Sequence, residues 1–207
     1  VKKMRRRSVL SSIKELKHPV FTTFELSSLS GKSLSAVTQS LNNLVKDGLV
    51  IKIYRGIWAD AGNEQLNSYA VIPYLFPRYR AYVSFISALH LHGIVEQIPQ
   101  TITLASTSHT RLIRTKLGVF SLHQITPKFF SGFDWYRETG KFLIAEPEKA
   151  LVDSLYLSFR KKKQFGYFPE LSFPKSFSFK KVKLWAMRIP DPKIRAYVLK
   201  KISDLKK

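Results

Sequence analysis

Short hydrogen-bonding side chains recur at helical spacing between residues 33 and 46, separated by apolar residues that would share the opposite face. Amide side chains can bond in pairs to the edge of an adenine in the major groove of B-DNA, and hydroxyl groups can bond to bases or phosphates. The polar face therefore predicts recognition of duplex DNA, without bond-breaking chemistry. Its members are Ser33, Ser35, Thr38, Gln39, Asn42, Asn43 and Lys46.

Cationic residues flank this stretch on both sides in the sequence. Lys52, Tyr54 and Arg55 surround the turn of a hairpin expected at residues 49–59, where they could reach a phosphate or the minor groove. Residues 2–7 form a basic arm, in which Arg5, Arg6 and Arg7 are suited to contacts with the DNA backbone. The alternative is a solvated polar helix, but the hairpin that follows at once favours DNA contacts.

Three short helices and this hairpin must position the polar face. Thr22 and Glu25 have the spacing of a capping box, with Phe21 and Leu26 at the ends of a hydrophobic staple, which predicts a helix start. Ser33 can cap the third helix, which should end before Gly48. Its expected buried stripe is Leu34, Val37, Leu41, Leu44 and Val45, and in the following strand Leu49, Ile51 and Ile53 alternate with Val50, Lys52 and Tyr54. The order of elements predicts a winged helix-turn-helix over residues 1–62.

Residues 63–207 read as a mixed α+β domain, because short helices and strands do not alternate as they would in a wound βαβ series. Strands are expected at 81–85, 101–107, 118–125 and 141–145, with residues 108–117 as a basic loop. Helices are expected at 69–77, 86–94 and 146–157, and a last one begins at Asp191-Pro192. Residues 160–207 would form a helical C-terminal extension.

Carboxylates at residues 146–153 raise the question of metal-dependent catalysis. Glu146 and Glu148 would lie at a helix N-terminus, where the helix dipole stabilises acidic groups without any catalytic role. Lys149 and Asp153 are four residues apart on the same predicted helix, so they can form an ion pair. The sequence contains no phosphate-binding glycine loop and no nucleophile elbow. We therefore expect a protein that is not an enzyme, with no catalytic residues, metal site or cofactor.

The formal net charge of +21, from 35 Lys and Arg against 14 Asp and Glu, points to a polyanion as the partner. Much of the excess lies in residues 160–207, which could present a second surface toward flanking DNA or RNA. The alternative is a helix with a solvated basic face. The candidates for this second nucleic-acid surface are Arg111, Arg114, Lys116, Lys161, Lys162 and Lys163.

The apolar runs are shorter than the ~20 residues needed to span a bilayer, so no membrane segment is expected. The basic N-terminus leads into a polar helix and does not resemble a secretory signal. The absence of cysteine suits a reducing compartment. We expect a cytoplasmic protein.

Three segments in order carry a family resemblance: "YVSFISALHLHGI", "TITLASTSHTRLIRTKLGVFSLHQI" and "IAEPEKALVDSLYL". Together with "LVKDGLVIKIYRGIW" they resemble the AbiEi-type antitoxins of abortive-infection systems, across roughly residues 8–158. The resemblance implies an autorepressor that binds inverted repeats in its own promoter. Since an inverted repeat needs two copies on the DNA, we expect a monomer in solution or pairing on DNA. It also implies a type IV antitoxin in antiviral defence, opposing a nucleotidyltransferase-like toxin without a stable complex. The family has no agreed catalytic residues to carry over.

Two other functions remain open from the sequence. One is a metal-dependent, nuclease-like enzyme that a winged helix targets to nucleic acid, and its cutting would depend on Glu146, Glu148 or Asp153. The other is an adaptor whose second domain binds a protein partner and whose winged helix is only structural, so that DNA binding would be weak and independent of sequence. The leading expectation is a sequence-specific, DNA-binding transcriptional repressor with an antitoxin domain.

Overall fold

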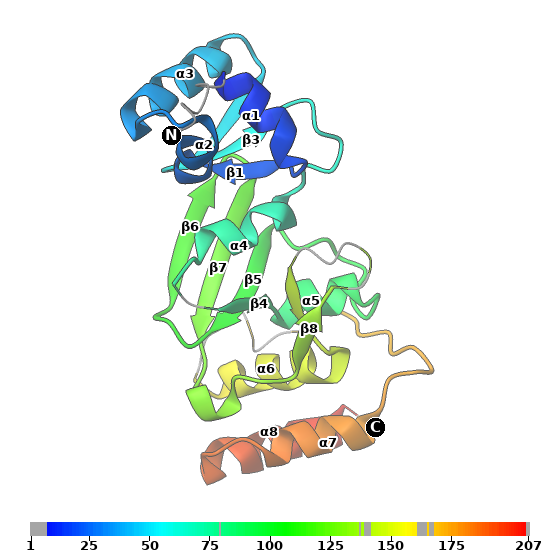
Figure 1. Ribbon diagram of the computed structural model, residues 1–207. Helices are drawn as coiled ribbons and strands as arrows, with labels where there is room; N and C mark the ends of the chain where they lie inside the picture. Colours follow the sequence, from blue (N-terminus) through cyan, green and yellow to red (C-terminus); the bar gives the residue numbers. More distant parts are fainter. Residues whose placement is uncertain are drawn as a thin grey trace. The chain divides into compact units, whose positions relative to one another are not determined.

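The computed structural model describes residues 8–78, 80–136, 138, 142–160, 165 and 168–205 (Figure 1). The fold is α+β, as expected. The chain divides into two compact units, Val1–Pro77 with Thr115–Gly118 and Arg78–Arg114 with Val119–Lys207. The first unit thus extends past the expected boundary at residue 62, because the segment up to Pro77 packs with the residues before it. We call these unit 1 and unit 2.

Unit 1 contains three helices and a small sheet, in the order α1 (Val9–Leu16), β1 (Val20–Thr22), α2 (Thr23–Ser30), α3 (Leu34–Lys46), β2 (Val50–Tyr54) and β3 (Ile57–Asp60). A 3-10 helix η1 (Ser68–Val71) and the short α4 (Ile72–Leu75) complete it. The sheet is antiparallel with the strand order β1-β3-β2 (Figure 1). The three helices and the hairpin were expected from the sequence, whereas the three-residue strand β1 was not.

The helix caps of unit 1 form as predicted. Thr22 Oγ1 accepts a hydrogen bond from the backbone N–H of Glu25 at 3.1 Å, and a carboxylate oxygen of Glu25 accepts one from the N–H of Thr22 at 2.6 Å. This capping box satisfies two amide groups that the helix itself cannot pair. Ser33 caps α3 in the same way, accepting from the N–H of Ala36 at 3.3 Å. The start of α3 is therefore set locally.

The core of unit 1 lies between the three helices and the sheet. Val37 and Leu41 are fully buried, as expected, and Leu44 and Val45 pack partly against the core. Leu34 was expected in the same stripe, but its side chain is 52% exposed, because the packing elements leave the first turn of α3 uncovered. The core residues are Val9, Ile13, Phe21, Leu26, Val37, Leu41, Val50 and Trp58.

The expected alternation along β2 is wrong in its register. The pairing of β2 with β3 shifts between Lys52 and Tyr54, which marks a β-bulge. An extra residue in one strand changes which face the next side chain occupies. As a result Val50 and Ile53 are both buried, although they are three residues apart, while Leu49 is exposed. Lys52 and Tyr54 still face solvent.

Unit 2 is built on a six-stranded mixed sheet with the order β6-β7-β5-β4-β9-β8 (Figure 1). Its pairs β4–β9 and β5–β7 are parallel, and β4–β5 and β8–β9 are antiparallel. The strands are β4 (Ala81–Val83), β5 (Thr101–Ser106), β6 (Arg111–Thr115), β7 (Gly118–Gln124), β8 (Phe133–Trp135) and β9 (Leu143–Ala145). Residues 108–117 were expected as a loop, but half of the segment is β6, in which Ile113 is buried.

The helices of unit 2 are α5 (Phe85–Leu91), α6 (Pro147–Phe159), α7 (Phe179–Met187) and α8 (Pro192–Asp204), with a 3-10 turn η2 (Pro127–Phe129). α6 packs against α5, and α7 and α8 pack against α6, so that α6 is an internal helix, as its apolar sequence predicts. Asp191 caps α8, accepting hydrogen bonds from the backbone N–H groups of Lys193 and Ile194. The helix α7 was not expected from the sequence.

An ion pair lies in the core of unit 2. The Lys149 ammonium pairs with the Asp153 carboxylate one helical turn along α6, as predicted, and both side chains are completely buried. Asp153 Oδ2 also accepts hydrogen bonds from Ser84 Oγ at 2.7 Å and from the Tyr82 hydroxyl at 3.0 Å. The Lys149 Nζ lies 3.9 Å from the centre of the Phe129 ring. Every polar atom of this cluster is thus paired within the protein.

Burial shifts the pKa of two groups in this cluster, Lys149 and Tyr82. It lowers the pKa of Lys149, although the neighbouring Asp153 carboxylate acts in the opposite direction. Burial also raises the pKa of the Tyr82 hydroxyl well above its ordinary value, and the charge of Asp153 adds to the effect.

Among the residues that the structure describes, no helix is both long and apolar enough to cross a membrane.

Candidate nucleic-acid interface

The polar face of α3 is open to solvent in unit 1. Of the seven residues proposed from the sequence, only Thr38 is half-buried, and the other six are exposed: Ser33, Ser35, Gln39, Asn42, Asn43 and Lys46. This face lies opposite Val37 and Leu41, whose burial fixes the rotation of the helix. The core packing of α3 therefore presents the polar side outward.

The hydroxyl and amide groups on this face differ in whether they already form hydrogen bonds within the protein. Thr38 Oγ1 donates to the carbonyl of Leu34 at 2.7 Å, and Ser33 Oγ is engaged in capping the helix. By contrast, the side chains of Gln39, Asn42 and Asn43 make no hydrogen bond to any other part of the chain that the structure describes. Their donors and acceptors remain available for a ligand, so these three amides are stronger candidates than Ser33 or Thr38.

Leu34 is a further candidate that sequence reasoning placed in the core. It lies in the first turn of α3 and is half exposed. An apolar side chain in this position can contact the methyl group of thymine. The only sequence signal for its exposure is its place next to the cap residue Ser33, where packing partners are fewest.

The turn between β2 and β3 carries exposed cations on a rigid base. Lys52, Tyr54 and Arg55 are all exposed around Gly56, whose φ of +72° suits a residue without a side chain. The backbone N–H of Thr23, at the start of α2, donates to the Gly56 carbonyl at 3.1 Å. The turn is therefore held against the helices and does not extend freely into solvent.

A tryptophan under the hairpin strengthens the same attachment. Trp58 is buried, and its Nε1–H donates to Thr23 Oγ1 at 2.9 Å. The Lys52 ammonium lies 5.2 Å from the centre of the Trp58 ring. This contact keeps Lys52 close to the hairpin surface while leaving its side chain accessible. The hairpin and α3 thus share one core and keep a fixed mutual orientation.

The remaining basic candidates separate into three groups. Arg5, Arg6 and Arg7, and likewise Lys161, Lys162 and Lys163, lie outside the described residues. Arg111 and Arg114 are exposed on β6 in unit 2, whereas Lys116 is exposed in the turn that belongs to unit 1. The proposed second surface is therefore not a single described cluster.

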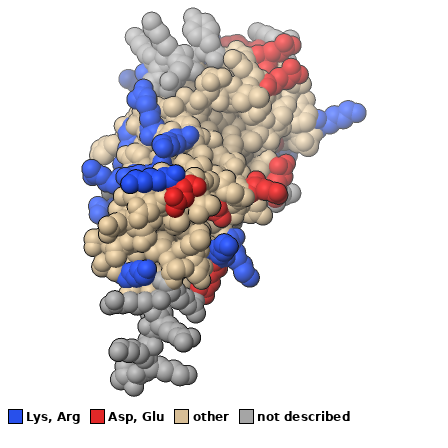
Figure 2. All heavy atoms as spheres, turned by 90° about the horizontal axis from the view of Figure 1, so that it is seen from above, with Lys and Arg blue, Asp and Glu red and all other residues tan. Residues whose placement is uncertain are grey.

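Basic side chains are numerous on the face drawn in Figure 2. Most of the Lys and Arg side chains visible there gather on one side, and Asp and Glu side chains lie both beside them and away from them. An excess of cations attracts a polyanionic ligand.

The carboxylates considered for catalysis have internal partners. Glu148 is buried and accepts from the backbone N–H of Ser178 at 3.0 Å, and a Glu146 carboxylate oxygen accepts from Trp185 Nε1 at 3.3 Å. Asp153 is committed to Lys149, as described above. Within the described ranges, no group of three or more His, Asp or Glu residues could hold a metal ion. These contacts give the carboxylates a structural role in joining α6 to α7 and β4.

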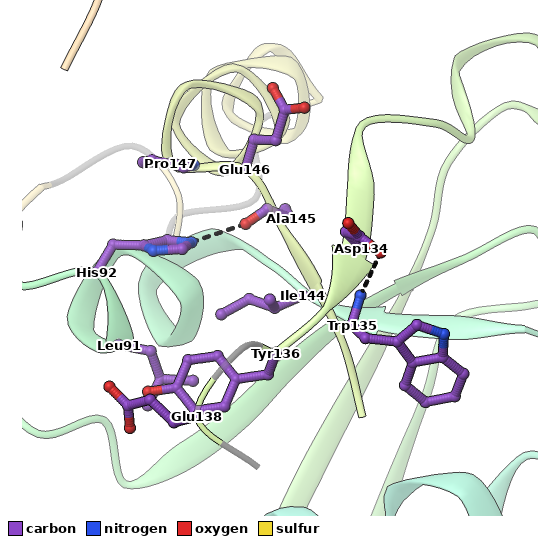
Figure 3. Close-up of a pocket in the computed structure, with 10 residues that line it drawn as sticks. All are labelled: Leu91, His92, Asp134, Trp135, Tyr136, Glu138, Ile144, Ala145, Glu146 and Pro147. Carbon is purple, nitrogen blue, oxygen red and sulfur yellow. Dashed lines mark hydrogen bonds between the residues drawn. The ribbon is translucent and has the colours of Figure 1, made fainter. Parts of the chain in front are cut away.

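A cavity of about 370 Å³ opens in unit 2 where α5, β8, β9 and the start of α6 meet (Figure 3). Its polar groups are largely engaged: His92 Nε2 donates to the Ala145 carbonyl at 2.8 Å, and Asp134 Oδ1 accepts from the backbone N–H of Trp135 at 2.7 Å. Its lining residues are Leu91, His92, Asp134, Trp135, Tyr136, Glu138, Ile144, Ala145, Glu146 and Pro147. None of these lining residues is a Ser, Thr, Cys or Lys, so the cavity lacks the hydroxyl, thiol or amine nucleophile of those classes of enzyme.

Comparison with known proteins finds no protein-family model and no curated protein that matches this chain. The resemblance to AbiEi-type antitoxins thus rests on the sequence segments that carry it. The candidate interface rests on the geometry of unit 1, which does not depend on that resemblance.

Proposed function

We propose that unit 1 is a winged helix-turn-helix and that the protein is a sequence-specific DNA-binding regulator of transcription. In this assignment α2 and α3 are the helix-turn-helix pair, α3 is the recognition helix, and the β2–β3 hairpin is the wing. The proposal rests on the exposed amide side chains of α3, which form no hydrogen bonds within the described chain. The cationic turn of the hairpin is attached to the same core.

The dimensions of the two partners support this arrangement. The major groove of B-DNA admits one α-helix. Residues in the N-terminal part of that helix contact the edges of the bases. Gln39 and Asn42 are three residues apart on the exposed face of α3, so that both can face the floor of the groove. Arg55 at the wing turn would then contact a phosphate or the adjacent minor groove. Bases would be read by α3, and the wing would fix the orientation.

We further propose that the regulator represses its own promoter and acts in the cytoplasm as the antitoxin of a type IV toxin–antitoxin module. Support comes from the resemblance of residues 8–158 to AbiEi-type antitoxins and from the absence of cysteine. Two copies of unit 1 would bind the two halves of an inverted repeat. Unit 2 would carry the activity that opposes a nucleotidyltransferase-like toxin without forming a stable complex.

Fluorescence anisotropy with two labelled duplexes tests the DNA-binding proposal. One duplex holds the region upstream of the protein's own coding sequence, and the other has the same length and base composition in scrambled order. We expect about 10³-fold or greater preference for the upstream duplex at physiological salt, which is at the low end of specific regulators. Equal affinity for both would contradict sequence reading and would leave unit 1 as a structural or non-specific domain.

A further inference from the structure

We infer that Lys116, at the tip of the β6–β7 hairpin, is a phosphate-binding residue of the same DNA interface as the wing. The inference rests on the proposed function and adds a contact from a segment more than fifty residues away in the sequence. It also separates Lys116 from Arg111 and Arg114, with which the sequence grouped it.

The turn that carries Lys116 is held in one conformation. The backbone N–H of Leu117 donates to Thr115 Oγ1 at 3.1 Å, and the Thr115 hydroxyl donates to the Gly118 carbonyl at 3.0 Å. Ser68 Oγ donates to the Leu117 carbonyl, which ties the turn to η1 of unit 1. Gly118 has a φ of +139°, which a residue with a side chain rarely adopts. A cation on this turn is therefore preorganised.

The turn contacts the wing strand itself. The backbone N–H of Lys116 donates to the carbonyl of Ile53 at 3.4 Å. Ile53 is the residue at the bulge of β2, and β2 is the outer strand of the sheet, with one edge not covered by β3. The hairpin tip thus lies against the edge of the wing, within unit 1.

The side chain of Lys116 is exposed, and the segment that its backbone contacts carries two cations. Lys52 precedes Ile53 and Arg55 follows it by two residues, and both are exposed. No described carboxylate forms an ion pair with Lys52, Arg55 or Lys116. Lys52, Arg55 and Lys116 are thus three exposed cations on segments that contact each other through the backbone, and a phosphate backbone would neutralise them and release counterions.

Protection of a sheet edge is the other explanation of the contact. A lysine next to an outer strand discourages pairing with other chains. Protecting the edge of β2 would need only the backbone contact and a polar side chain at position 116. It would not require Lys116 to contribute to DNA binding. The two explanations therefore differ in the salt dependence of binding, since each phosphate contact adds about 0.9 to the slope of log affinity against log salt for B-DNA.

The test compares Lys116→Ala with Lys128→Ala, which removes the same charge from an exposed site in unit 2. Affinity for the upstream and scrambled duplexes is measured across a series of salt concentrations. We expect Lys116→Ala to lower the slope by about one and to weaken both duplexes by a similar factor of several-fold at low salt. Lys128→Ala should leave the slope at the wild-type value.

A Lys116→Ala slope equal to wild type, or an equal decrease in Lys128→Ala, overturns the inference. Thermal unfolding of each variant establishes that the chain still folds, and Lys116→Gln serves as a second variant that keeps the length of the side chain without its charge. The outcome is distinct from failure of the proposed function. If wild-type protein does not prefer its upstream duplex, sequence reading fails, while the slope of non-specific binding still decides the role of Lys116.

Discussion

Replacing Lys149 by methionine is expected to lower the free energy of unfolding by about 3–5 kcal/mol. The substitution leaves the Asp153 carboxylate at full burial with only the hydroxyl groups of Tyr82 and Ser84 as partners. Removing one member of a buried ion pair strands the other charge in a medium of low dielectric constant, which costs more than the pair itself contributes. Urea denaturation followed by circular dichroism measures the change.

Two further variants make this result specific to the ion pair. Lys128→Met, at an exposed position, should change stability by less than about 0.5 kcal/mol. The double variant Lys149→Met/Asp153→Asn should be more stable than Lys149→Met alone, because it removes the unpaired charge and keeps an acceptor for Tyr82 and Ser84. If the double variant is no more stable than the single one, the stranded carboxylate is not the cause.

Removing the amides of Gln39 and Asn42 should cause the largest loss of sequence-specific binding. Each loss of a bidentate base contact costs about 1–3 kcal/mol, so the double alanine variant should bind the upstream duplex about as weakly as it binds unrelated DNA. Both side chains are exposed and uncommitted in the free protein, so no structural contact is lost by truncation. Stability should therefore stay close to that of the wild type.

A panel of duplexes with single base-pair changes separates base reading from general attraction. Gln39→Ala and Asn42→Ala should each relax the preference at one or two positions, while Arg55→Ala should weaken all members of the panel alike. If Arg55→Ala alters the preference for particular bases and the two α3 variants do not, then the wing reads the sequence and the roles assigned to the two elements are wrong.

Local interactions explain which parts of the fold the sequence predicts. The capping box of Thr22 and Glu25 and the serine cap of α3 depend on residues three positions apart, and both form as expected. Pro147 at the start of α6 and Asp191 before α8 are equally local signals. The exposed face of α3 follows from helical periodicity, because burying Val37 and Leu41 turns the amides outward.

The sequence-based predictions that were wrong concern features that depend on distant parts of the chain. β6 carries Arg111 and Arg114 and looks like a loop, but pairing with β7 makes it a strand. The bulge in β2 shifts its pairing with β3 between Lys52 and Tyr54, and it becomes visible only in the register of the two strands. Leu34 follows the periodicity of the buried stripe, yet no neighbouring element covers it.

In the candidate nucleic-acid interface, too, some features follow from the local sequence and others depend on distant parts of the chain. The polar face of α3 and the cations of the wing turn could be proposed from spacing alone. The hydroxyl groups of Ser33 and Thr38 form hydrogen bonds with the backbone, whereas the amides of Gln39 and Asn42 do not. This difference can be recognised only from the hydrogen bonds of the folded chain. Lys116 could be recognised as basic, but its contact with Ile53 joins segments that only the folded chain brings together.

Affinity cleavage from α3 tests the central claim most directly. The chain contains no cysteine, so Asn43→Cys supplies a unique thiol on the exposed face of α3 for a tethered iron chelate, and Lys128→Cys supplies a control in unit 2. With α3 in the major groove, strand breaks from position 43 should cluster within a few base pairs in each half of the upstream site, and position 128 should give no such cluster. Breaks spread evenly along the duplex, or the same pattern from both positions, would contradict insertion of α3 into the groove.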